Sequence, residues 1–140
     1  MKLASYANGT RDGELVVVSS DLKRARPAPD IARTMIELIE NWDDLAPRLA
    51  ALDLSDAPDF DVNRCLAPLP RARQFLDGSA FLTHGRLMDK AFNMPPNPDM
   101  ETIPMMYQGM SDDFRGPRSA VEFPSEADGI DFEGEFAVIL

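Results

Sequence analysis

Two short runs near the start of the chain have the apolar pattern of β-strands. They are residues 2–6 (KLASY), which alternate loosely, and residues 14–18 (ELVVV), which are rich in β-branched side chains. Between them lie an Asn-Gly dipeptide at 8–9 and an Asp-Gly dipeptide at 12–13, both of which favour tight turns. The pattern therefore predicts a β-hairpin over about residues 1–20.

A helical period follows the hairpin. Apolar residues recur at spacings of three and four, which places them on one face of a helix. They are Ile31, Met35, Leu38, Ile39 and Trp42. Asp30 directly precedes the first of them and is a residue type that caps helices. We expect a helix over about residues 30–41 and a shorter one over about 44–52, with Pro47 near its first turn. We interpret both helices as core elements.

The remaining stretches of the first half are predicted to be connectors. Residues 23–29 are basic and contain prolines, and residues 53–63 are acidic and rich in turn formers. We interpret the acidic run as a solvated linker and a domain boundary. Farther on, Asp77 and Gly78 indicate a turn, and residues 94–124 hold half of the chain's 12 prolines, which predicts an irregular loop.

The last residues, 129–140 (GIDFEGEFAVIL), have the pattern of a turn glycine followed by a strand that stays apolar to its last position. A core strand needs partners on both sides and is an open edge without them. We therefore expect the chain to be a piece of something longer.

Charge and composition narrow the class of protein. The 140 residues include 14 Lys and Arg against 24 Asp and Glu, a net charge of −10, which argues against non-specific binding to nucleic acid or to an anionic membrane surface. Apolar runs are far shorter than a bilayer span, and the polar N-terminus lacks a signal-peptide core. One cysteine and one histidine exclude an internal disulfide and a zinc finger. We expect a cytoplasmic protein.

Acidic residues near the end of the chain are the sharpest candidates for chemistry. In a strand, Asp131, Glu133 and Glu135 would share one face, with the two glutamate Cα atoms about 6–7 Å apart. Neighbouring carboxylates repel each other unless a cation neutralises them. Oxygen ligands favour Mg²⁺, Ca²⁺ or Mn²⁺ over zinc. The alternative is an edge strand whose polar face lies in water.

Other chemistry-bearing residues carry weaker signals. His84 is the only histidine, and a lone histidine is more often incidental than a general base. Cys65 has no neighbouring pattern of a nucleophile and is interpreted as a small buried hydrophobe. Phosphate-binding loops, dinucleotide fingerprints and nucleophile-elbow motifs are absent from the sequence.

Three motifs in order resemble the fumarylacetoacetate hydrolase family. They are LAPLPRARQFLDGSAFLTH (66–84), IPMMYQGMSDDFRGPRSAV (103–121) and GIDFEGEFAVIL (129–140). The less distinctive residues 1–65 resemble the small N-terminal module of bacterial members. The resemblance thus covers the whole chain but only the front part of a family protein.

The resemblance implies a role for each of five residues. The family's D-x6-H spacing corresponds to Asp77 as a metal ligand and His84 as the general base. Its Tyr-x-Gly loop assigns Tyr107 to substrate contact, and its D-[FY]-E-x-E strand assigns Glu133 and Glu135 to the metal.

The resemblance also implies an α+β fold in two parts. Residues 1–65 would form a small module of a hairpin and helices, and residues 66–140 the beginning of a mixed β-roll catalytic domain that is incomplete at the C-terminus. The resemblance also implies a homodimer for the full-length family protein. The implied activity is hydrolytic cleavage of a carbon–carbon bond in a β-diketo acid to give two carboxylic acids, as in aromatic amino acid catabolism, with Mg²⁺ as the expected cation and Ca²⁺ or Mn²⁺ as alternatives.

Other interpretations remain open at this point. The chain alone is expected to be inactive, because other site residues of the family would follow residue 140. A second hypothesis is a non-catalytic remnant or interaction fragment, and a third is a purely structural acidic domain whose resemblance to the family is accidental. Relatives with a similar metal cage decarboxylate or hydrate 2-oxo acids, so a diketo or a 2-oxo acid is the expected small-molecule substrate. Ser79 and Asn93 stand where fumarylacetoacetate hydrolases have a substrate-contacting Tyr and Arg, so the resemblance does not name the substrate.

Overall fold

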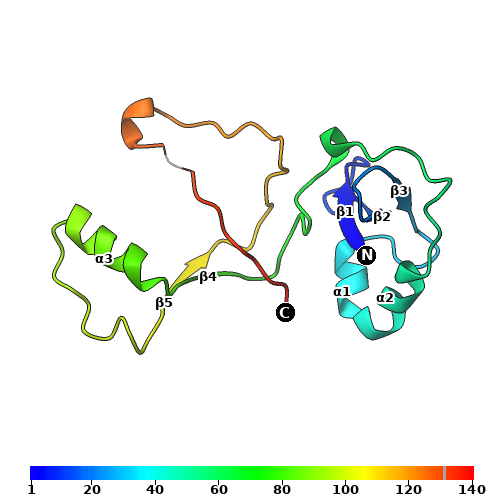
Figure 1. The fold of residues 1–140 in the computed structure, drawn as a ribbon. Coiled ribbons are helices and arrows are strands. Elements are labelled where there is room, and N and C mark those ends of the chain that lie inside the picture. The colour runs from blue at the N-terminus through cyan, green and yellow to red at the C-terminus, as the bar shows by residue number, and fades with distance from the viewer. Residues whose placement is uncertain (131) are drawn as a thin grey trace.

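A computed structural model describes residues 1–130 and 132–140. Its first part is a three-stranded antiparallel sheet with two helices against it (Figure 1). The strands, in the order β1-β2-β3, are β1 (Lys2–Tyr6), β2 (Glu14–Val18) and β3 (Ala25–Pro27). The helices are α1 (Met35–Glu40) and α2 (Trp42–Ala50), followed by a short 3₁₀ turn at Val62–Arg64.

The predicted hairpin is confirmed. β1 and β2 pair from Lys2 opposite Val18 to Tyr6 opposite Glu14. The turn ends at Gly13, whose φ is +64°, and a Cβ there would lie 2.4 Å from the carbonyl oxygen of Tyr6. Only glycine fits this position, because it must both adopt a positive φ and approach the neighbouring backbone closely.

A third strand replaces part of the predicted connector at 23–29. Ala25–Pro27 pairs antiparallel with β2, from Val18 opposite Ala25 to Val16 opposite Pro27. Proline removes a backbone donor, which is tolerated at the end of a strand at the edge of a sheet, as Pro27 is here. The expectation of a plain connector is therefore wrong over these three residues.

Both predicted helices form, with different starts. Thr34, and not Asp30, caps α1: its hydroxyl accepts a hydrogen bond of 3.2 Å from the backbone N–H of Glu37. Asp30 lies upstream of α1 in a separate turn, in which the carbonyl of Ala28 accepts the N–H of Ile31 and of Ala32. Helix α2 starts at Trp42 instead of 44, so Pro47 lies inside it and removes one helical hydrogen bond.

The core lies on both faces of β2. On one face, Leu15 and Val17 pack with Leu38 of α1 and Leu49 of α2, all fully or almost fully buried. This confirms the helical stripe as core. Burial of apolar area of this kind is the main stabilising contribution in a domain of this size.

The opposite face of the sheet is covered by the acidic segment 53–63. The ring of Phe60 stacks on Tyr6 with centroids 6.0 Å apart, and Ala57 is buried. Arg24 and Asp59 form a backbone bridge. The prediction of a solvated linker is therefore wrong for these residues, because apolar side chains between the acids anchor the segment to the sheet.

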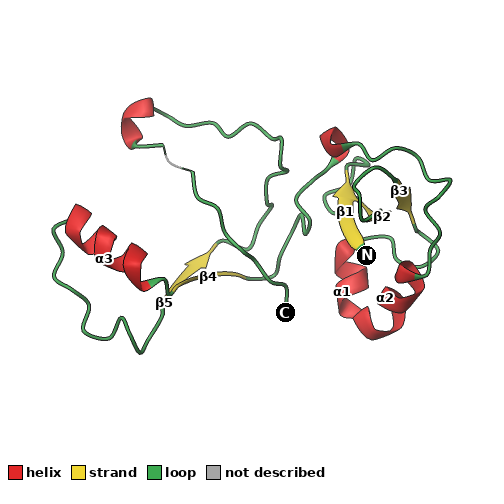
Figure 2. Ribbon diagram, in the orientation of Figure 1, coloured by secondary structure: helices red, strands yellow, loops and turns green. Residues whose placement is uncertain are grey.

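The second part of the chain is open. Strands β4 (Phe75–Ser79) and β5 (Met105–Gly109) pair antiparallel, and helix α3 (Leu82–Ala91) lies on the connection between them. Figure 2 shows that most of the chain beyond α2 is loop, with one further 3₁₀ turn at Glu126–Asp128. Asp77 and Gly78, predicted as a turn, lie inside β4, because β5 provides the backbone partner that sequence patterns do not reveal.

The predicted terminal strand is not present in the described residues. Residues 132–140 have no regular secondary structure, and Asp131 lies outside the described residues. A strand exists only where a neighbouring backbone pairs with it, and alternation alone supplies no partner. The mixture of strands and helices confirms the α+β class. Within residues 1–130 and 132–140, no helix is long and apolar enough to cross a bilayer.

Candidate functional site

Asp77 and Tyr107 lie directly opposite each other in the β4–β5 ladder. Residues opposed in an antiparallel pair point to the same face of the sheet, with Cα atoms about 4.5–5.5 Å apart. Both side chains are exposed, Tyr107 by 64%. The structure thus brings the candidate metal ligand and the candidate substrate contact together on one accessible face.

His84 lies in the first turn of α3, shortly after β4 ends. The helix begins after Phe81, which has no side-chain cap, and His84 is exposed. His84, the candidate base, therefore lies on the element that directly follows the strand of Asp77, the candidate metal ligand.

Glu133 and Glu135 lie in the irregular terminal segment and are exposed. A Cβ built at Gly134, between them, would meet nothing within 4 Å, so the space at its side-chain position is open. In the part of the chain that the structure describes, no three side chains of histidine, cysteine, aspartate or glutamate form a group that could hold a metal ion. The described arrangement therefore does not gather Asp77, Glu133 and Glu135.

The residue types of the candidate ligands suit a divalent cation, but their positions in the structure do not. Carboxylate oxygens suit Mg²⁺, Ca²⁺ and Mn²⁺, which require several oxygen ligands around one point. Asp77, Glu133 and Glu135 supply such donors, but in the described residues they do not converge. This arrangement supports no chemical step at a metal.

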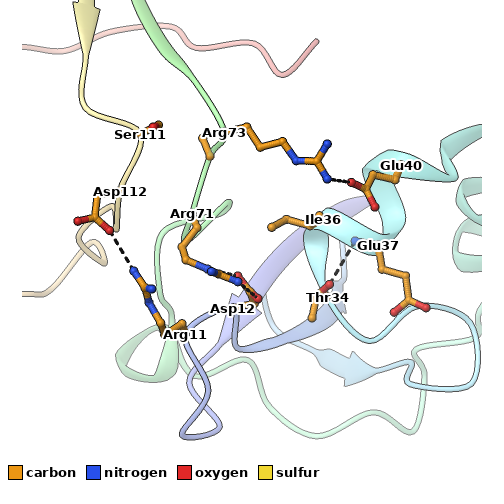
Figure 3. A pocket seen from close by; sticks show the side chains of 11 residues that line it. Arg11, Asp12, Thr34, Ile36, Glu37, Glu40, Arg71, Arg73, Ser111 and Asp112 are labelled. Atoms are coloured by element: carbon orange, nitrogen blue, oxygen red, sulfur yellow. Dashed lines mark hydrogen bonds and ion pairs between the residues drawn. The ribbon is translucent and has the colours of Figure 1, made fainter.

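Charged residues at the junction of the two parts form an arrangement that sequence reasoning missed. Arg71 donates two hydrogen bonds to Asp12, Nε to Oδ1 at 2.8 Å and Nη2 to Oδ2 at 2.5 Å (Figure 3). Arg73 pairs with Glu40 of α1. These residues border an open hollow of about 590 Å³ that also includes Arg11 and other polar side chains.

Ion pairing at this junction shifts ionisation equilibria. The hydrogen bond from Arg71 lowers the pKa of Asp12 below its ordinary value of 3.8, although burial acts in the opposite direction. The same bond raises the pKa of Arg71. Asp12 and Arg71 are 59 residues apart, and no local pattern could have linked them.

Comparison with protein families covers almost the whole chain. Residues 1–71 match the family model described as fumarylacetoacetase N-terminal domain 2, and residues 73–140 match that of the fumarylacetoacetate hydrolase C-terminal domain. A search of curated proteins gave no match. The two family matches follow each other in the order expected from the sequence motifs. The chain belongs to the fumarylacetoacetate hydrolase family.

Proposed function

We propose that this chain carries residues of a hydrolase that cleaves a carbon–carbon bond in a β-diketo acid with the help of a divalent cation. The two family matches support the general class of a hydrolase or lyase. The observation that carries the finer proposal is the opposition of Asp77 and Tyr107 across the β4–β5 ladder. A ligand for the cation and a group that contacts the substrate must share one accessible face, and these two residues do.

His84 is the proposed general base. It accepts a proton from the attacking water, whose oxygen forms a bond to the carbonyl carbon. The adjacent carbon–carbon bond then breaks, and its electron pair leaves with the departing carbon as an enolate that is protonated afterwards. A divalent cation held by Asp77, Glu133 and Glu135 would supply Lewis acidity to the diketo oxygens and would stabilise this developing negative charge.

Tyr107 is proposed to orient the substrate. Its hydroxyl can donate or accept a hydrogen bond, and its side chain extends from the same face of the ladder as Asp77. We assign Asp77, Glu133 and Glu135 to the cation, with residues 132–140 joining the β4–β5 face to complete the set. Mutual repulsion of the three carboxylates opposes this assembly until a cation neutralises them.

The wider expectations remain predictions. We take residues 1–65 as the small N-terminal domain and 66–140 as the first part of the catalytic domain. Mg²⁺ is the expected cation, and a homodimer in the cytoplasm is the expected state of the family protein.

Calorimetric titration of the chain with Mn²⁺ tests the cation assignment. We expect Glu133→Gln/Glu135→Gln to weaken binding by at least about tenfold, because both changes remove a charged ligand. Glu122→Gln/Glu126→Gln is the matched control, since it removes the same charge from exposed positions of the neighbouring segment. Equal affinities for all three proteins would refute the assignment.

Hydrolysis of a β-diketo acid by the purified chain tests its activity. We expect no measurable turnover with Mg²⁺, because three carboxylates alone bind this cation weakly: it requires near-octahedral coordination and loses its water reluctantly. Turnover that disappears in His84→Ala would overturn the expected inactivity while supporting the role of His84. Turnover that persists in His84→Ala would contradict both.

A non-catalytic interaction fragment is the second candidate. It is favoured by the large apolar side chains that the second part of the chain exposes, among them Phe81 at 78%. Exposed apolar surface of this extent is typical of a protein interface. The calorimetric experiment separates the two candidates, because an interaction fragment has no need of Glu133 and Glu135 for cation binding.

A further inference from the structure

The β4–β5 ladder has little intrinsic support. Every residue of β4 is exposed, and so are four of the five residues of β5. An isolated two-stranded pair is at best marginally stable in water. Its connection, residues 80–104, is long, so loop closure also works against pairing. Contacts beyond the regular ladder therefore contribute to holding the two strands in register.

The pairing continues beyond the regular ladder at the end nearest the first part. Arg71 and Asp113 form an antiparallel bridge. Arg71 is four residues before Phe75 and Asp113 is four after Gly109, so the bridge keeps the register of the Phe75–Gly109 pair. Beside it, the N–H of Phe114 donates to the carbonyl of Pro70 at 2.8 Å. We call residues 70–79 and 105–114 together the ribbon.

The turn of the first hairpin contacts both strands of the ribbon at this end. We call residues 7–13 the hairpin loop. Its Asp12 accepts two hydrogen bonds from Arg71 on one strand. Its Arg11 donates from Nη2 to Asp112 of the other strand at 3.0 Å (Figure 3). The same nitrogen donates to Asp113 at 2.8 Å. Two adjacent loop residues therefore connect the two strands.

The Asp12–Arg71 contact differs from an ordinary surface ion pair. Its two parallel bonds form a fork that fixes orientation as well as distance. The side chains of Asp12 and Arg71 are 25% and 39% exposed. In every other ion pair of the described residues, at least one partner is more exposed than either of these. The Arg11 pairs are more exposed and contribute less.

The hairpin loop is itself fixed before it meets the ribbon. Oδ1 of Asn8 accepts hydrogen bonds from the backbone N–H and the hydroxyl of Thr10, at 3.0 and 2.7 Å. At its other end, Gly13 leads into the buried strand β2. A pre-ordered loop loses little conformational entropy when it binds, so more of the free energy of its contacts remains to stabilise the ribbon.

We propose that the hairpin loop is a positioning element, in which Asp12 with Arg71 and Arg11 with Asp112 and Asp113 hold the ribbon in the register that sets Asp77 opposite Tyr107. Arg71 is six residues from Asp77, about 20 Å along an extended strand, so the loop acts on this pair only through the backbone ladder. The inference goes beyond the proposed function and does not depend on which reaction the family member performs.

Millisecond hydrogen–deuterium exchange on the full 140-residue chain tests this role. We expect Asp12→Asn and Arg71→Gln each to speed amide exchange in β4 and β5 by about tenfold, with exchange in β1, β2 and α1 unchanged. The double variant should exchange no faster than either single variant, because both changes remove the same contact. Arg71→Lys, which keeps the charge and loses the fork, should lie between wild type and Arg71→Gln.

Arg24→Gln is the control, since Arg24 also pairs with an aspartate, Asp59, but lies away from the ribbon. It should leave exchange in β4 and β5 at the wild-type rate. The proposal is overturned if β4 and β5 exchange at the wild-type rate in Asp12→Asn and Arg71→Gln. It is equally overturned if β1 and β2 lose as much protection as the ribbon, because the residues would then act on general stability.

Discussion

Phe75 lies opposite Gly109, and its ring occupies the space that any side chain at position 109 would need. A Cβ built on Gly109 would be 2.1 Å from Cδ1 of Phe75. The Phe75 ring also packs edge-on against Phe114, with centroids 5.6 Å apart, so moving it away sacrifices a second contact. Packing against Phe75 therefore explains why position 109, in the Tyr107-Gln108-Gly109 sequence, is glycine, independently of any role in catalysis.

Substitution of the two ladder glycines should therefore have opposite outcomes. Gly109→Ala is expected to disrupt β4–β5 pairing, because the added methyl group overlaps the Phe75 ring. Gly78→Ala adds the same group to the same ladder, where its nearest neighbour is the flexible end of Met106 at 3.8 Å, and pairing should persist. Cross-strand nuclear Overhauser effects between Asp77 and Tyr107 provide the measurement. Their survival in Gly109→Ala would contradict this packing.

The Asp12 carboxyl should titrate below its ordinary pKa of 3.8. Because the pKa is lowered in the folded chain, the stabilisation from the Arg71 pair is complete above the ordinary value and is lost as pH falls through the folded value. Arg11 also faces this carboxyl and acts in the same direction. Carboxyl-carbon resonances followed from pH 7 downwards give the midpoint, which Arg71→Gln should move back towards 3.8. A midpoint unaffected by Arg71→Gln would exclude the pair as its cause.

Truncation of leucines in the two parts of the chain should have very different costs. Leu38 is fully buried in the core beside Leu15 and Leu49, so Leu38→Ala should lower the free energy of unfolding of the first part by about 2–5 kcal/mol. Leu87 on α3 is 61% exposed, and Leu87→Ala should change the free energy of unfolding by less than about 0.5 kcal/mol. Urea unfolding followed by the fluorescence of Trp42 measures both. Similar costs for the two variants would argue against this core.

The cap of α1 should depend on an oxygen at position 34. Thr34→Ala removes the acceptor for the Glu37 N–H and should cost about 1 kcal/mol of unfolding free energy. Thr34→Ser keeps the oxygen and should restore most of the loss. If serine and alanine are equally destabilising in urea unfolding, the contribution of Thr34 comes from its methyl group and not from capping.

Local signals in the sequence predicted the first part of the fold well. The two turn dipeptides and the β-branched run of β2 identify a hairpin, and the apolar spacing up to Trp42 identifies helices, because these signals act over a few residues. Strand β3 and the packing of Phe60 on Tyr6 were missed. Both depend on partners that are far away in the sequence and leave no periodic trace.

For the candidate site, too, the sequence predicted what depends on nearby residues and missed what depends on contacts between distant ones. Family motifs single out Asp77, His84, Tyr107 and the two glutamates, and the structure brings one pair of these, Asp77 and Tyr107, opposite each other. A turn predicted at Asp77 and Gly78 is in fact a strand, because dipeptide preferences give way to pairing with β5. No signal in the sequence linked Asp12 to Arg71, since ion pairs between separate loops have no characteristic spacing.

Paramagnetic broadening by Mn²⁺ tests most directly whether Asp77, Glu133 and Glu135 share one cation. Trace Mn²⁺ is added to the isotopically labelled chain, and amide resonances are followed around β4, β5 and residues 132–136. We expect broadening at Asp77, Tyr107 and both glutamates at the same low Mn²⁺ concentration, and its loss at all four in Glu133→Gln/Glu135→Gln. Broadening that is confined to the glutamates, or that persists at Asp77 in the double variant, would contradict the shared site.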